Sequence, residues 1–220
     1  MLFNRHKIYK QFFLLILSST ISAQGFSIAR IQYSGGGDWY ADPSSLPNLI
    51  DFISNETNIK IENNEFKIKL TSENLYNHTY LYLTGHGNIR FNDEEVRVLR
   101  NHLLKGAFLH ADDNYGMYDS FKREMKKVFP DKEWVELPID HPIYNCYFNF
   151  PNGLPKVHEH NGKPPQGLGL FEKDRLIVFF SYESDLGDGW EDSEVHNNPA
   201  SVRNSALKMG TNIVWYSLTQ

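Results

Sequence analysis

Apolar residues recur along this chain with two different periods, and segments with one period alternate with segments with the other. Residues 26–33 alternate between apolar and polar side chains, and residues 80–84 form a short apolar run, which is typical of buried strands. Over residues 46–53 and 96–103, apolar side chains instead recur every three to four positions, which is typical of amphipathic helices. Strands that alternate with helices predict an α/β protein with a mostly parallel sheet and crossover helices.

Local signals predict where several elements begin and end. Asn92 and Glu95 have the spacing of a capping box at the start of one helix, and Gly106 ends that helix. A strand is predicted over residues 107–110, and Pro130 closes the amphipathic helix that follows it.

The second half of the chain is less regular. Residues 134–165 are rich in proline and predict a long ordered insertion, which in a compact domain is more often functional than decorative. Residues 168–180 predict a hairpin. A last helix is predicted from Pro199 to Gly210, followed by a final strand over residues 213–216.

The first residues have the order of a secretory signal peptide. Three basic residues precede a short apolar run over residues 12–17, and the small residue Ala23 suits cleavage. The apolar run is well short of the roughly 20 residues that span a bilayer, so no permanent anchor is expected. The sequence therefore predicts a signal peptide over residues 1–23, a single α/β domain over residues 24–220, and export to the periplasm or the extracellular space.

The charge pattern excludes some partners. The net charge of −5 becomes −8 when the three basic residues leave with the signal peptide, so nucleic acid is not an expected partner. No later apolar stretch is long enough to cross a membrane, so no integral span is expected after cleavage.

The single cysteine, Cys146, excludes an internal disulfide framework. We expect it to be a packed thiol, because it does not lie on a strand-to-helix turn.

Polar residues gather where predicted strands end, and ligands of parallel sheets bind outside the carboxyl ends of the strands. The residues at these ends are Asp38, Trp39, Tyr40, His86, Asp112, Asp113 and Asn114. We expect them to line a ligand-binding crevice together with His141. Asp188 and Trp190 lie in a glycine-broken acidic loop, where hydrogen bonding and stacking would suit a sugar ring, although a turn with an exposed tryptophan explains them equally simply. The glycines of residues 35–37 lack the spacing of a phosphate loop and are better explained by a close backbone turn.

Catalytic and metal-binding candidates follow from the same pattern. The candidate catalytic residues are Asp112, Asp113, His86 and His141. Paired carboxylates can divide acid and base roles between them, although one of the two aspartates could instead cap a helix. His158 and His160 point the same way in an extended loop and are the candidate metal ligands, with Asp112, Asp113 or His141 completing the site. Because no local metal signature such as H-E-x-x-H is present, structural or sugar-binding histidines are favoured. No cofactor is therefore expected, and a divalent metal is the alternative.

Seven motifs in order give the chain a family resemblance. They lie at residues 36–40, 83–87, 108–113, 137–143, 153–160, 184–190 and 206–213. In these motifs the chain resembles the family called domain of unknown function 4159. The resemblance implies a fold similar to the class I glutamine amidotransferases, which is a flavodoxin-like three-layer sandwich. Where those enzymes carry a catalytic cysteine this chain has residues 112–114, so the resemblance implies no glutamine hydrolysis by that mechanism. The motif that begins at His141 is also similar to one in trehalose-utilisation-like relatives, which suggests sugars.

Two functions remain open from the sequence. The first is a non-catalytic domain of the cell envelope that binds a small molecule or glycan, or interacts with other envelope proteins. The alternative is a metal-assisted hydrolase that acts on an envelope glycan or peptide, with ligands or acid and base groups drawn from His86, Asp112, His158 and His160.

Overall fold

Seven strands form a single mixed sheet. The computed structural model describes residues 25–220, so the predicted signal peptide lies outside the described residues. The strands are β1 (Ile28–Ile31), β2 (Phe66–Ile68), β3 (Tyr80–Leu83), β4 (Phe108–Asp112), β5 (Val135–Glu136), β6 (Gln166–Glu172) and β7 (Arg175–Tyr182). Their order is β2-β1-β3-β4-β7-β6-β5, in which β2, β1, β3, β4 and β7 are parallel. β6 is antiparallel to both of its neighbours. The predicted α/β class is confirmed, with an antiparallel hairpin joined to a parallel core.

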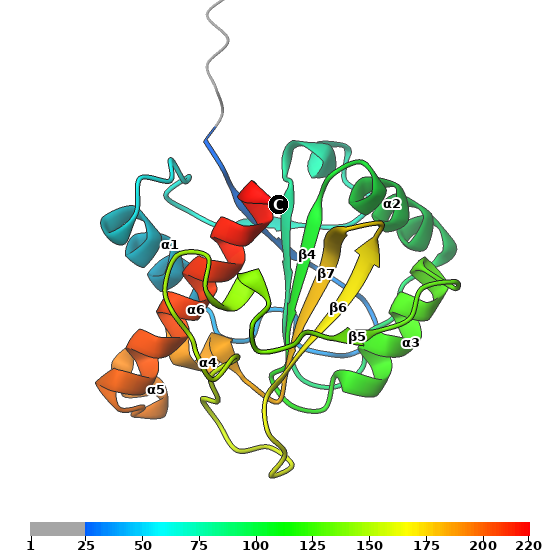
Figure 1. The fold of residues 1–220 in the computed structure, drawn as a ribbon. Coiled ribbons are helices and arrows are strands. Elements are labelled where there is room, and N and C mark those ends of the chain that lie inside the picture. Colours follow the sequence, from blue (N-terminus) through cyan, green and yellow to red (C-terminus); the bar gives the residue numbers. More distant parts are fainter. Residues whose placement is uncertain (1–24) are drawn as a thin grey trace, which may run out of the picture.

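Helices cover both faces of this sheet, as Figure 1 shows. They are α1 (Ser45–Glu56), α2 (Asp93–Leu104), α3 (Tyr118–Val128), α4 (Leu186–Trp190), α5 (Ser193–His196) and α6 (Ala200–Thr219), with short 3-10 helices η1 (Glu73–Asn77) and η2 (Pro142–Tyr144). One apolar core lies on the side of α2 and α3, and a second lies on the side of α1, α4 and α6. None of the helices described between residues 25 and 220 is both long and apolar enough to cross a membrane.

Several sequence signals have the predicted structural effect. The capping box at the start of α2 is formed, because the Asn92 side chain accepts from the Glu95 N–H while the Glu95 carboxylate accepts from the Asn92 N–H. The predicted hairpin is β6 and β7, and the insertion before it contains only β5 and η2. β2 was not predicted from the sequence, because Phe66 and Lys67 are exposed in this edge strand and no apolar pattern marks it.

The predicted final strand over residues 213–216 is wrong, because α6 continues through it to Thr219. Gly210 does not end the helix. A Cβ atom there would lie 2.6 Å from Leu49 Cδ1 and 2.8 Å from Trp190 Cζ2, so this glycine lets α6 approach α1 and α4 closely. The β-branched residues Ile213 and Val214 follow Gly210 and are buried in the second core. This packing overrides their strand propensity.

Replacing Asn92 by alanine should lower the free energy of unfolding by about 1 kcal/mol, because the first turn of α2 loses its side-chain acceptor. In a domain of this size the melting temperature should fall by roughly 2–4 °C. Asn92→Asp keeps the acceptor and is the matched control. An equal loss in both variants, measured by thermal unfolding, would contradict the capping role.

Candidate functional site

Buried carboxylates gather beyond the carboxyl ends of β1, β4 and β7. Asp42 follows β1, Asp112 ends β4 and Asp113 follows it, and Asp185 and Asp188 follow β7. Each of these five residues is at most 9% exposed. Burial of a charged carboxylate is costly unless the charge is paired, hydrogen-bonded or bound to a cation. The carboxyl edge of the sheet is therefore the part of the fold whose electrostatics need explanation.

Three histidines face these carboxylates. His158 Nδ1 lies 2.5 Å from Asp188 Oδ2, and His196 Nε2 lies 3.2 Å from Asp188 Oδ1, so the two imidazoles contact opposite oxygens of one carboxylate. His160 Nε2 lies 2.9 Å from Asp185 Oδ2. His158 and His160 come from the irregular insertion, whereas His196 lies on α5 near the start of α6.

We call six of these residues the acid–histidine cluster. They are Asp42, Asp185, Asp188, His158, His160 and His196. Two sets of three within it have ligand atoms that all lie within 4.8 Å of one another, so each set is spaced to hold a metal ion. One set is His158, Asp188 and His196, and the other is Asp42, Asp185 and Asp188.

Buried polar atoms without a partner are concentrated at the same place. Within residues 25–220, eight buried side-chain nitrogen or oxygen atoms have no hydrogen-bond partner. They are Asp42 Oδ2, Tyr82 OH, Asp113 Oδ1, Asn114 Nδ2 and Oδ1, His160 Nδ1, Glu183 Oε1 and Asp185 Oδ1. Every one belongs to a cluster residue or to a residue on the strands and loops that converge on this edge. Unsatisfied buried groups are rare in native proteins, and their concentration here points to a ligand.

Asp112 has a structural role in this edge. Its Oδ1 accepts a hydrogen bond from Ser181 Oγ at 2.5 Å, and its Oδ2 accepts one from the Gly187 N–H at 2.6 Å. Because it also accepts from the Leu186 N–H, it binds the first amides of α4. The capping explanation therefore holds for Asp112. Asp113 instead lines a cavity of about 360 Å³, together with Lys163, Gln166 and Tyr182.

Buried charged groups also fix the loop that carries Asp42. The Arg30 guanidinium donates to the Asp42 carbonyl oxygen at 3.1 Å and pairs with Glu65 at 2.7 Å. Glu191, which follows α4, accepts from the Ser44 and Ser45 amides at 2.8 and 2.9 Å and so caps α1. These contacts hold the Asp42 loop against α4.

Backbone strain is concentrated around the cluster. Six residues other than glycine have positive φ in residues 25–220, and five of them belong to this edge. These five are Asp42 (φ 54°), Tyr115 (φ 87°), Glu183 (φ 57°), Asp185 (φ 59°) and Asn197 (φ 53°). Such conformations cost of order 1–3 kcal/mol each and persist mainly at functional sites.

The cluster shifts the pKa values of its own members. Burial, reinforced by Asp188 and Asp185, raises the pKa of Asp42 from its ordinary 3.8 to about 7. Burial and Asp185 raise the pKa of Asp188 to about 7 as well. Asp185, with help from Asp188, raises the pKa of His158 to about 9, while His158 and His160 overcome burial and lower the pKa of Asp185. Protons and imidazolium charge therefore balance the carboxylates of the cluster.

A second polar pair lies at the switch between β1 and β3. His86 Nδ1 lies 3.0 Å from Asp38 Oδ2, and the His86 N–H also donates to Asp38. The His86 side chain is 54% exposed. The glycine run brings this loop close to its neighbour, because a Cβ atom at Gly37 would lie 2.7 Å from the His86 carbonyl oxygen. The predicted close backbone turn is confirmed.

The remaining candidates differ in where the fold places them. Tyr40 is exposed and Trp39 is packed against the first core, whereas Asn114 is buried beside the cluster. Trp190 is not an exposed stacking surface, because it is fully buried and its Nε1 donates to the Ala206 carbonyl oxygen. The expectation that its ring stacks on a sugar is therefore wrong.

His141 does not reach the crevice either. Its ring packs on Tyr216 in the last turn of α6 and on Phe171 near the end of β6, which pairs with the start of β7. His141 therefore lies toward the opposite end of the sheet. Its Nδ1 accepts a hydrogen bond from the Ile143 N–H. Cys146 is half-buried, and burial raises the pKa of its thiol to about 11, as expected for a packed thiol.

Three cluster residues were missed by the sequence analysis. Asp42 and His196 carry no local motif, and Asp185 lies in the motif at residues 184–190 without being singled out there. Only the folded chain brings the three residues to one point. The acidic character of the loop that holds Asp185 was the available signal, but its left-handed backbone was not visible in the sequence.

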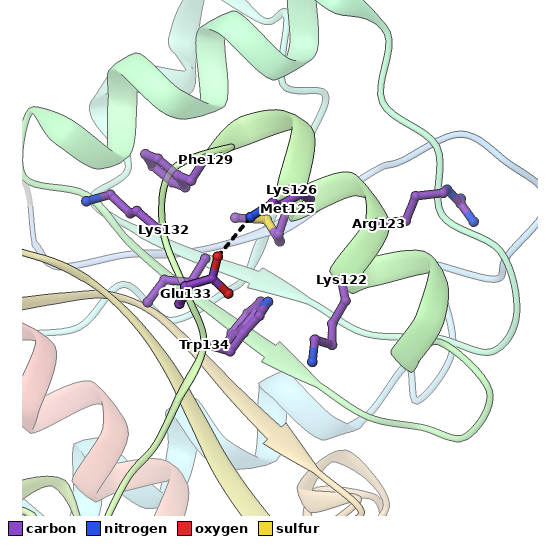
Figure 2. Close-up of a pocket in the computed structure, with 9 residues that line it drawn as sticks. Lys122, Arg123, Met125, Lys126, Phe129, Lys132, Glu133 and Trp134 are labelled. Atoms are coloured by element: carbon purple, nitrogen blue, oxygen red, sulfur yellow. Dashed lines mark hydrogen bonds and ion pairs between the residues drawn. The ribbon is translucent and has the colours of Figure 1, made fainter.

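A larger cavity of about 460 Å³ lies elsewhere, between α3 and the segment that leads to β5. Figure 2 shows Lys126 and Glu133 paired beside Trp134, and their Nζ and Oε1 atoms lie 3.1 Å apart. Lys132 is likewise paired with Glu172 at 2.6 Å. Because these cations already have acidic partners, this cavity is a poorer candidate site than the cluster.

Asp42→Asn should change how the stability of the chelator-treated protein depends on pH. The raised pKa of Asp42 means that the folded protein binds an extra proton, so this contribution is complete below about pH 4 and is lost as pH rises through about 7. Asparagine does not titrate and tolerates the left-handed backbone. From pH 5 to pH 8 the melting temperature of the wild type should therefore fall relative to Asp42→Asn. The exposed Asp51→Asn is the control, and parallel profiles for Asp42→Asn and wild type would contradict the assignment.

Comparison with known proteins gives a family but no activity. No curated protein matches the chain. The family profile described as "Domain of unknown function (DUF4159)" matches residues 27–218. That span runs from β1 into α6 and includes the whole acid–histidine cluster. The chain therefore belongs to the DUF4159 family.

Proposed function

We propose that the protein is a divalent-metal-dependent hydrolase of an exported, envelope-facing type, whose ion is held by His158, Asp188 and His196. The observation that carries the proposal is the convergence of one ligand atom from each of these residues within 4.8 Å. Both imidazoles are about one-third exposed or less, so the site is fixed by the fold and still open on one side.

The chemistry of the three side chains fits a transition metal such as zinc. Two imidazole nitrogens and one carboxylate oxygen form a typical catalytic zinc set, in which water takes the fourth position. Such an ion lowers the pKa of bound water to near 7 and polarises the bond to be cleaved. Asn198 Oδ1 lies 3.2 Å from His158 Nε2, and a partner of this kind orients a ligating imidazole.

Residues of the chain would bind the substrate and move protons. Asp113 lines the cavity of about 360 Å³, and burial raises the pKa of its carboxyl. A carboxyl whose pKa is raised by burial is suited to general acid or base work. Lys163, Gln166 and Tyr182 add polar groups along the same cavity, which suits a glycan or a peptide. His86, oriented by Asp38, offers a second proton-transfer group on the same edge of the sheet.

Two wider expectations are part of this proposal. The order of the parallel strands, β2-β1-β3-β4-β7, matches the 2-1-3-4-5 order of flavodoxin-like sheets, which supports kinship with the glutamine amidotransferase fold. Export to the periplasm or the extracellular space rests on the predicted signal peptide.

A non-catalytic ligand-binding module is the second candidate function. Tyr40 and Tyr115 are 63% and 49% exposed on the same edge of the sheet, and exposed rings of this kind suit stacking on a sugar. The two functions differ in turnover. A binding module would retain glycan in the metal-loaded state and release no product, whereas a hydrolase would release one.

Elemental analysis of mature protein purified without a histidine tag should find bound zinc or a similar transition metal. Chelator should lower the melting temperature, because the metal binds only the folded state. His196→Ala should lose the ion, whereas His141→Ala, at the other end of the sheet, should keep it. A wild type that takes up no zinc at pH 8 and melts identically with and without chelator would overturn the proposal.

A further inference from the structure

We infer that the cluster holds a second cation, bound by Asp42, Asp185 and Asp188 and sharing Asp188 with the first ion. This inference rests on the proposed metal site, but it concerns other ligands and another class of metal. The cation expected at this second site is a hard one such as Mg²⁺ or Mn²⁺.

Asp42 and Asp185 each direct an unpartnered oxygen into the fold. Asp42 Oδ2 and Asp185 Oδ1 have no hydrogen-bond partner, and the two residues are 9% and 2% exposed. Together with an Asp188 oxygen, their ligand atoms lie within 4.8 Å of one another. The unpartnered oxygens are an observation independent of the clustering, and buried oxygens of this kind are suited to bind a cation.

Asp188 is placed to bridge two ions. Its Oδ1 faces His196 at 3.2 Å and its Oδ2 faces His158 at 2.5 Å, so both oxygens are directed toward the first site. A carboxylate has about four lone-pair sites on its two oxygens. Binding to one ion therefore leaves lone pairs for a second ion on the side of Asp42 and Asp185.

Among residues 25–220, the ion pairs around the cluster leave the Asp42 carboxylate without a cation. Without metal, His158 faces Asp188 and His160 faces Asp185 as ion-pair partners. Asp42 has no ion-pair partner among residues 25–220, because the nearby Arg30 pairs with Glu65 and donates to the Asp42 backbone instead.

The donor atoms select the kind of cation. All three ligands are carboxylates, and oxygen-only sites suit Mg²⁺, Ca²⁺ or Mn²⁺ rather than softer metals. Space for the ion depends on Gly187, where a Cβ atom would lie 2.9 Å from Asp42 Oδ2 and 3.2 Å from Tyr82 OH. The Tyr82 hydroxyl, itself unpartnered, is a further oxygen beside the site.

The test is a metal titration of the tag-free protein after removal of metal by chelator. Zn²⁺ is added first to one equivalent, and Mn²⁺ binding is then followed by the loss of its free-ion electron paramagnetic resonance signal. The wild type should bind one Zn²⁺ and one Mn²⁺. Asp42→Asn should keep the Zn²⁺ and weaken Mn²⁺ binding by more than about tenfold. Asp188→Asn should weaken both, and the exposed Asp51→Asn should weaken neither.

The outcomes separate the two claims. A wild type that binds one Zn²⁺ but no Mn²⁺ overturns the second site and leaves the proposed function standing. A wild type that binds neither ion overturns both. Equal Mn²⁺ affinity in the wild type and Asp42→Asn would show that Mn²⁺ binds elsewhere and would also overturn the inference. Asp42→Asn is expected to fold, since the amide relieves carboxylate repulsion without changing the shape of the side chain.

Discussion

Three like-charged carboxylates share one buried volume in this protein, and the surrounding fold is arranged to hold them there. Asp42, Asp185 and Asp188 have ligand atoms within 4.8 Å of one another although none of the residues is more than 9% exposed. Mutual repulsion at this distance is strong in a medium of low dielectric, so the carboxylates must take up protons, imidazolium partners or metal ions. Asp112 and Glu191 oppose their separation by binding the first amides of α4 and of α1. These hydrogen bonds fix the starts of α1 and α4 beside the cluster.

Strain and charge repulsion are costs that a protein retains when function requires them. The left-handed backbone at Asp42 and Asp185 aims both carboxylates inward, and unpartnered polar atoms collect beside them. The two apolar cores of the sandwich supply the stability that offsets these costs. A bound cation would remove most of the repulsion, so cation binding would stabilise the folded state.

Much of the fold was predictable from local signals, whereas the site depended on long-range geometry. Alternating periods predicted the α/β class, and the capping box predicted the start of α2. The end of α6 was not predictable, because Gly210 serves the close packing of two helices and resembles a helix stop only locally. Asp112, Asp113, His158 and His160 were identified from their positions after strands or in the insertion. The missed residues, Asp42, Asp185 and His196, lie before α1, at the start of α4 and on α5, and only the folded chain brings them together.

The most direct test of the account is a crystal structure of the mature protein, grown above pH 7 with Zn²⁺ and measured at the zinc absorption edge. The account predicts an anomalous peak about 2.0–2.2 Å from an imidazole nitrogen of His158 and of His196 and from an oxygen of Asp188. Well-ordered side chains with no anomalous peak among them, and with the Asp188 carboxyl bonded directly to the two imidazoles, would contradict it. The cluster would then be an ion-pair network that serves the fold alone.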